Sequence, residues 1–129
     1  MTVDDPETKA EVEAAFAAYE RALVTNDVAA LDGFFWASEA AVRYGATENL
    51  YGREAIQAFR AARSPVGLAR ELERTHITCF GRDCAVAAAL FRRESAPRKV
   101  GRQMQTWIRF PEGWRIVAAH ISIIDAQGP

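Results

Sequence analysis

The second half of the chain constrains the fold most, because it reads as four extended segments joined by short turns. The segments are residues 70–79, 84–94, 101–110 and 114–124. The joints between them, at 81–83, 95–100 and 111–113, contain glycine, proline, serine and aspartate, which favour turns. Consecutive strands connected by short loops pair antiparallel. The sequence therefore predicts a largely antiparallel sheet in this half.

The first half reads as helices. Val12, Phe16, Tyr19 and Leu23 recur at spacings of four, three and four, which places them on one face of a helix over residues 6–24. The other elements expected here are a short helix at 28–31, a short strand at 41–44, a loop at 45–50 and a helix at 53–63. Helices that are segregated from an antiparallel sheet define an α+β architecture. We expect three N-terminal helices packed on the concave face of a curved sheet, with a small pocket at the open end.

The length of 129 residues fits one domain, residues 1–129. The acidic N-terminus lacks the features of a signal peptide, and no run approaches the roughly 20 apolar residues of a membrane span. We therefore expect a cytoplasmic protein with no membrane partner. A formal net charge of −1 argues against nucleic acid, which binds through many basic contacts to phosphate.

Several kinds of site have no support in the sequence. It contains no G-x-S-x-G, no H-E-x-x-H and no phosphate-binding glycine loop, and it has only two histidines. Cys79 and Cys84 match neither a zinc pattern nor a C-x-x-C motif, and are interpreted as small buried hydrophobes. We expect no metal, no cofactor and no nucleotide.

Tyr19 and Arg43 are the first candidates for a functional pair. A buried phenol needs a partner for its hydroxyl, although a tyrosine packed in the core is the commoner explanation of such a position. An arginine that points inward from the strand at 41–44 is costly unless an anion meets it, whereas an outward one is simply solvated.

Further candidates for substrate binding come from all parts of the chain. Arg60 and Arg63 lie one helical turn apart beside Phe59, and either clamp a carboxylate or line a solvated edge. In the last strand, strict alternation puts His120 and Ser122 on one face with Trp114, Ile116 and Ala118. The remaining candidates are Trp36, Asn49 with its neighbour Glu48, and Gln105, whose strand face the period does not fix.

A homodimer through the outer face of the sheet is expected from the surplus of apolar strand residues. These are Trp107, Ile108, Ile121 and Ile123.

Three segments carry a resemblance to a known family: AFAAYERALVTNDVAALDGFFW (15–36), VRYGATENLYGREAIQAFRAAR (42–63) and GRQMQTWIRFPEGWRIVAAHISII (101–124). The chain resembles the AtzH-like group (DUF3225) of the NTF2-like superfamily, which includes the oxalurate-catabolism protein HpxZ. The resemblance implies a cone-shaped fold. It also implies a cofactor-free decarboxylating amidohydrolase that converts 1,3-dicarboxyurea to allophanate in cyanuric acid breakdown, with Tyr19 and Arg43 as the key pair.

The chemistry implied by the resemblance leaves alternatives open. Tyr19 either protonates the departing nitrogen or positions a water, and an adjacent arginine would lower the pKa of the phenol. A noncatalytic accessory protein that binds a ureido acid beside an amidase is a second hypothesis. An isomerase, the third, would need a carboxylate base inside the cone, whereas the Asp and Glu residues here are expected mainly on helix surfaces and turns.

Overall fold

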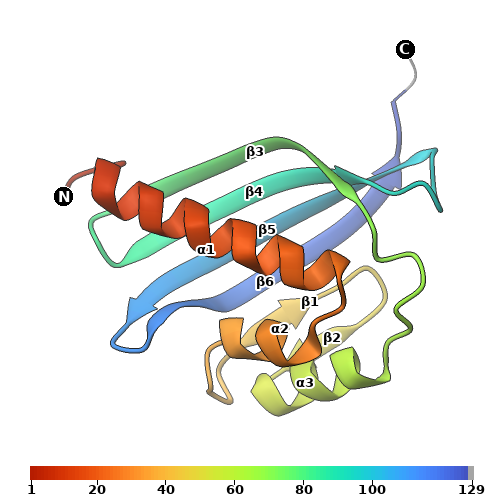
Figure 1. Cartoon of the computed structure of the whole chain (residues 1–129), viewed down its shortest axis with the longest axis horizontal. Coiled ribbons are helices and arrows are strands. Elements are labelled where there is room, and N and C mark those ends of the chain that lie inside the picture. Colours follow the sequence, from red (N-terminus) through yellow and green to blue (C-terminus); the bar gives the residue numbers. More distant parts are fainter. Residues whose placement is uncertain (128–129) are drawn as a thin grey trace.

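The structure, a computed structural model, describes residues 1–127 and confirms the α+β class (Figure 1). Its helices are α1 (Pro6–Val24), α2 (Val28–Phe34) and α3 (Arg53–Ala62). Its strands are β1 (Val42–Tyr44), β2 (Asn49–Tyr51), β3 (Glu71–Phe80), β4 (Cys84–Arg92), β5 (Lys99–Phe110) and β6 (Gly113–Asp125). Helix α2 thus continues past its expected end at residue 31, and β2 replaces part of the expected loop at 45–50.

The strands form one sheet in the order β2-β1-β6-β5-β4-β3. Strands β3, β4, β5 and β6 pair antiparallel, each with the next, and β1 and β2 form an antiparallel hairpin. Strand β1 runs parallel to β6. Strand β2 carries no periodic signal of its own. It forms because β1 supplies its hydrogen-bonding edge and because the Tyr44 and Tyr51 hydroxyls meet across the hairpin at 3.0 Å.

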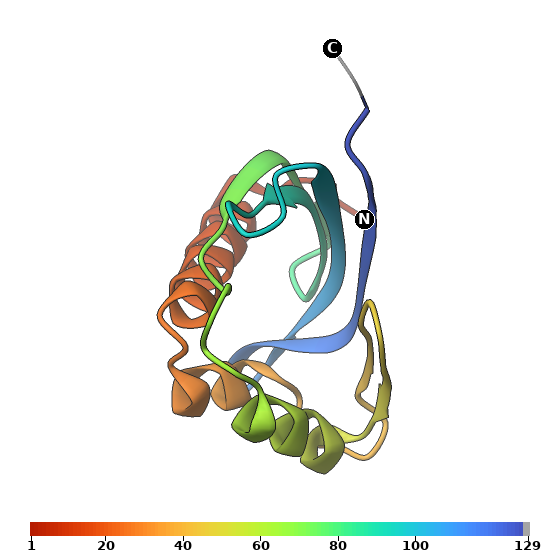
Figure 2. The ribbon, with the colours of Figure 1, turned by 90° about the vertical axis from the view of Figure 1, so that its right-hand side faces the viewer.

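The sheet curves strongly around the helices, as the end-on view in Figure 2 shows. Two β-bulges accompany the curvature, since a bulge bends a strand and increases its twist. One lies in β3 between Glu73 and His76, where Arg74 adopts a positive φ of 49°. The other lies in β6, because Thr106 pairs with Ala118 whereas Trp107 pairs with Ile116, so that Val117 is an extra residue.

The bulge at Val117 reverses the alternation of β6. Before it, Trp114 and Ile116 face the core; beyond it, Ala119 is buried and His120 is exposed. The expectation that His120 and Ser122 share a face with Ile116 is therefore wrong, because strict alternation holds only without an inserted residue.

Helix α1 packs along the concave side of the sheet (Figure 1). Asp5 caps it by accepting a hydrogen bond from the Thr8 amide at 3.1 Å, and Pro6 begins its first turn. The stripe predicted from the sequence is buried as expected, and its four residues are Val12, Phe16, Tyr19 and Leu23. This packing brings Tyr19 to the middle of the concave face.

Other residues of the core and surface refine the expectations. Cys79 is fully buried and Cys84 half-buried, and both are free thiols. Trp107 is fully buried on the concave side, so it adds nothing to the outer apolar surface. Of the helices within residues 1–127, none combines the length and apolarity needed to cross a membrane.

Candidate anion-binding site in the concave face

Tyr19 lies at the centre of an aromatic cluster on the concave face. Its ring makes edge-on contacts with Phe34, Phe35 and Trp107, with centroids 5.9, 6.4 and 6.2 Å away. Its phenol oxygen accepts a hydrogen bond from Nη2 of Arg60 at 2.8 Å. A guanidinium can only donate, so the hydrogen of the phenol remains available for a second partner.

The electrostatic surroundings of Tyr19 favour its ionised form. Burial alone would raise the pKa of the phenol, but the positive charges of Arg60, Arg43 and Arg70, together with the Arg60 hydrogen bond, outweigh burial. The pKa of Tyr19 is therefore lowered below its ordinary value. A phenol in this position gives up its proton more readily than a phenol in water.

Arg60 reaches Tyr19 from the buried face of α3, and only 1% of its surface is exposed. Its guanidinium lies 5.3 Å from the centre of the Phe35 ring and 5.7 Å from that of Tyr19. Its Nε and Nη1 atoms have no hydrogen-bond partner among residues 1–127. A buried guanidinium without a carboxylate is costly, which favours an anionic ligand at this position.

Arg43 projects inward from β1 and is ion-paired. Its Nη1 donates to Oε1 of Glu48 at 2.7 Å, and its guanidinium lies 5.1 Å from the centre of the Phe59 ring. Burial would raise the pKa of Glu48, but hydrogen bonds from Thr47 and the charge of Arg43 lower it overall. Glycine at position 45 leaves room for this carboxylate, because a Cβ there would lie 1.7 Å from Oε1 of Glu48.

Arg63 is the C-cap of α3, and its guanidinium also lies near Phe59, 5.8 Å from the ring centre. Burial and the nearby charges of Arg60 and Arg43 lower the pKa of Arg63 to about 10. Its Nε and Nη2 atoms find no partner within the described chain. A second carboxylate near Arg63 would offset this repulsion.

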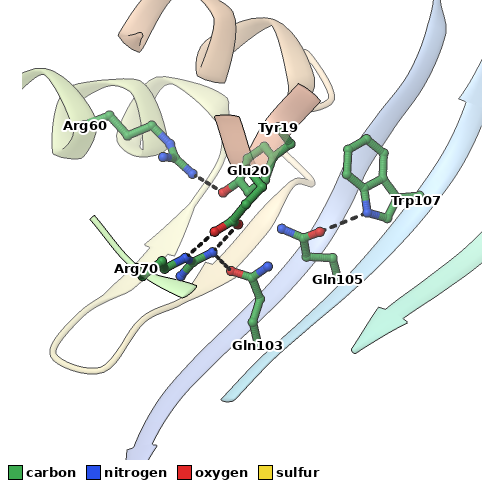
Figure 3. A network of polar contacts seen from close by, with 7 residues as sticks. All are labelled: Tyr19, Glu20, Arg60, Arg70, Gln103, Gln105 and Trp107. Atoms are coloured by element: carbon green, nitrogen blue, oxygen red, sulfur yellow. Dashed lines mark hydrogen bonds and ion pairs between the residues drawn. The ribbon is translucent and has the colours of Figure 1, made fainter. Parts of the chain in front are cut away.

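A further network closes the cluster on the side of the sheet (Figure 3). Arg70, at the start of β3, donates from Nε and Nη2 to the Glu20 carboxylate, both at 2.7 Å, and from Nη2 to Gln103 Oε1 at 3.0 Å. On the same strand face, Gln105 Oε1 accepts from Trp107 Nε1 at 3.0 Å. The amide nitrogens of Gln103 and Gln105 are buried and unpartnered among residues 1–127.

The concave face thus carries more positive than negative charge. Four arginines, Arg43, Arg60, Arg63 and Arg70, face two carboxylates, Glu20 and Glu48. The unpartnered polar atoms of this cluster within the described residues are all N–H donors. Such an arrangement can bind an anion, with donors for its oxygens and aromatic walls for its planar part. No three His, Cys, Asp or Glu side chains in residues 1–127 gather as a metal site would require.

The structure brings together six of the residues predicted from the sequence. Tyr19, Arg43, Phe59, Arg60 and Arg63 form one connected group, and Gln105 faces the same side of the sheet.

Four predicted residues lie elsewhere. His120 and Ser122 face the outer side, where Ser122 accepts a hydrogen bond from Arg102. Asn49 is exposed and pairs with Tyr44, which packs edge-on against His120 on that outer side. Trp36 turns away to stack on Phe110, while Phe35 takes the inward position.

Sequence reasoning missed part of the cluster. Glu20 was not singled out, and Gln103 belonged to a strand face that the period did not fix. Carboxylates were expected mainly on helix surfaces and turns, yet Glu20 and Glu48 both pair with arginines of the cluster. Arg70 and Glu20 are 50 residues apart, so no local pattern joins them.

Comparison with protein families gives a match to the AtzH-like family model over residues 1–127. Among curated proteins, none matches this chain.

Solved structures give two close relatives. A protein of unknown function from the DUF3225 family of Pectobacterium atrosepticum is 56% identical with a TM-score of 0.93, and the match covers 95% of each chain. A cystatin-like fold protein from Burkholderia xenovorans is 48% identical with a TM-score of 0.93, covering 99% of each chain. The fold is shared by an NTF2-like protein of unknown function from Pseudomonas putida, which is 18% identical. Its TM-score is 0.75, and the match covers 95% of this chain and 98% of that chain.

Proposed function

Because the chain belongs to the AtzH-like family, we propose that it is a cofactor-free decarboxylating amidohydrolase acting on a small ureido dicarboxylate. The substrate of this proposal is 1,3-dicarboxyurea and the product is allophanate. The observation that carries it is the Tyr19 phenol, bonded to Arg60 inside a cluster of guanidiniums that exceeds its carboxylates in charge.

The substrate class matches the chemistry of the cluster. A urea that carries two carboxylates is a planar dianion, and planar guanidiniums bind carboxylates through paired hydrogen bonds. Arg60 offers buried Nε and Nη1 donors, and Arg43 retains a buried Nε donor beyond its bond to Glu48. The charges of both arginines act on Tyr19, so we expect the reacting N-carboxyl group to bind beside this phenol.

The proposed reaction breaks the bond between nitrogen and the carbon of one carboxylate. Dicarboxyurea and one proton give allophanate and carbon dioxide; with water instead, the products are allophanate and bicarbonate. The electron pair of the broken bond stays on nitrogen, which takes up the proton. The enzyme must therefore deliver a proton to that nitrogen, or a water to the departing carbon.

Tyr19 is the proposed proton donor. Arg60 donates a hydrogen bond to the phenol oxygen, so the phenol hydrogen is free to point to the substrate nitrogen. The positive surroundings that lower the pKa of Tyr19 also stabilise the phenolate left after transfer. Proton uptake from water then restores the phenol. In the other variant, the same oxygen positions the attacking water.

The direct test incubates the pure protein, Tyr19→Phe and Arg43→Ala with enzymatically generated 1,3-dicarboxyurea and follows allophanate and inorganic carbon. Turnover above the spontaneous rate by the native protein, lost in both variants, is expected. Absence of turnover by the native protein would reject the catalytic proposal. Binding without product would instead favour the accessory protein that works beside an amidase in oxalurate or other ureide catabolism.

A further inference from the structure

Two aromatic rings in this molecule each hold a pair of guanidiniums. The guanidiniums of Arg43 and Arg63 lie 5.1 and 5.8 Å from the centre of the Phe59 ring. Those of Arg70 and Arg93 lie 4.2 and 4.7 Å from the centre of the Phe91 ring. Both pairs therefore use a π face to hold charged groups close together.

In each pair, one arginine has a carboxylate and the other does not. Glu48 binds Arg43 and Glu20 binds Arg70, both at 2.7 Å. Arg63 Nε and Nη2 and Arg93 Nε are buried atoms without a partner within residues 1–127. Arg63 and Arg93, which have no carboxylate partner in the described chain, therefore have N–H donors available for a ligand.

The environment of Arg93 supports this distinction. It is half-buried, and burial together with the charge of Arg70 lowers its pKa, although the charge of Glu20, which is ion-paired with Arg70, opposes this shift. The charge of Arg93 makes the smallest of the named contributions to the lowered pKa of Arg63. An anion that both guanidiniums bind would offset this repulsion.

The position of Arg93 suggests how a ligand reaches the cluster. Arg93 and Arg70 both line an open pocket of about 730 Å³ between the start of β3 and the β4–β5 connection. The glutamates that line it, Glu71 and Glu94, are exposed and form no ion pair with Arg93. Arg70 connects this pocket to the interior, because its Nη2 also donates to the buried Gln103.

The Phe91 pair is built into the sheet. Phe91 pairs with Gly101 on β5, and a Cβ at position 101 would lie 2.0 Å from the Phe91 ring. Only glycine lets this ring lie against the strand and present its face to the two arginines. The sheet thus fixes the place of the Phe91 ring, over which Arg70 and Arg93 lie.

We propose that Arg63 and Arg93 together bind the second carboxylate of the substrate and thereby select a dianion over a monoanion. This inference rests on the proposed function, in which Tyr19 and Arg60 handle the carboxylate that departs. Allophanate has lost that departing carboxylate, so it can use only one of the two binding positions. Product is then held more weakly than substrate, which favours its release.

The test measures binding rather than turnover, with glutarate as the dicarboxylate probe and butyrate as its counterpart with one carboxylate removed. Isothermal titration calorimetry compares the native protein with Arg63→Met and Arg93→Met. Methionine retains an apolar stem against the aromatic ring and removes the charge. Arg102→Met, an exposed arginine on the outer face of β5, is the matched control.

The native protein is expected to bind glutarate at least about tenfold more tightly than butyrate, as one additional charge-assisted contact implies. Either variant should weaken glutarate binding severalfold and leave butyrate binding and the Arg102→Met control unchanged. Equal affinity of the native protein for both acids would overturn the inference, and so would variants that keep the native preference.

Folding and activity are separable from this result. Removal of a half-buried, unpartnered charge should leave the melting temperature unchanged or raise it, which thermal unfolding checks. If dicarboxyurea is not turned over but the glutarate preference depends on Arg63 and Arg93, the proposed function fails and the dicarboxylate site stands. Turnover with an unchanged KM in both variants would reject the site and keep the function.

Discussion

The two faces of strands β5 and β6 carry similar residue types in opposite states. On the concave face, Gln103 and Gln105 are buried and their amide nitrogens lack partners within residues 1–127. On the convex face, Arg102 is exposed and donates to Ser122, and His120 lies in solvent beside Tyr44. Polar groups on the concave face are thus buried and partly unpartnered, whereas those on the convex face are exposed to solvent.

This difference teaches that burial, rather than residue type, distinguishes the arginines. An exposed guanidinium is hydrated and screened, so it contributes little to binding or stability. A buried guanidinium is stable when it is ion-paired, as Arg70 is, or when it binds an anionic ligand, as we expect of Arg60. The predictions below compare matched substitutions on the two faces.

The largest contrast is expected between two tyrosines. Tyr19→Phe removes the proposed proton donor and should lower kcat on 1,3-dicarboxyurea by about 10²–10⁴-fold, the usual contribution of a general acid. Tyr44→Phe, which loses an exposed hydroxyl bonded to Tyr51, should leave kcat unchanged. Steady-state assays of both variants check this. Similar losses in the two would remove the distinction between the faces.

The second contrast concerns stability. The Arg70 side chain is 2% exposed and its partner Glu20 14%. Arg70→Met leaves the Glu20 carboxylate buried without its cation, which should lower the free energy of unfolding by about 3–5 kcal/mol. Arg102→Met on the convex face should change it by less than about 0.5 kcal/mol. Urea denaturation measures both, and a cost for Arg70→Met as small as that of Arg102→Met would refute the role given to the pair.

The third contrast lies in the ionisation of tyrosines. The pKa of Tyr19 is lowered by the surrounding arginines, and that of Tyr44 is raised by its hydrogen bond to Tyr51. Ultraviolet titration of tyrosinate should therefore show an early step that Tyr19→Phe removes. The sign for stability follows: a lowered pKa in the folded state stabilises it above the unfolded value near 10. That contribution is lost as the pH falls through the lowered pKa.

The smallest effect is expected at His120, which the bulge turns to the convex face. His120→Gln should change kcat and KM by less than about twofold, as surface substitutions usually do. Steady-state kinetics over several pH values is the measurement. A large loss would mean that the outer face takes part in the reaction.

Much of the fold could be predicted from local periodicity. The stripe Val12, Phe16, Tyr19 and Leu23 is set by helix geometry alone, and the turns between the last four strands by their glycine and proline residues. The bulge at Val117 could not be predicted, because it arises from pairing with β5 and leaves no mark in the sequence of β6. One extra residue then exchanged the faces of everything after it.

The candidate site was predictable at positions where a polar or charged side chain occurs among apolar residues of a helix or strand. Tyr19 on a buried stripe and Arg43 within a short strand are such positions, and both lie inside. The partners of these residues were not predictable. Arg60 reaches Tyr19 across 41 residues of sequence, and Glu20 reaches Arg70 across 50, so only the folded chain reveals the pairs.

The most direct test of the account follows carbon-13-labelled 1,3-dicarboxyurea by NMR with and without the native protein. The account predicts allophanate and one equivalent of inorganic carbon, formed faster than in buffer, with glutarate as a competitive inhibitor. Identical decay of the substrate in the presence and absence of the protein would contradict it.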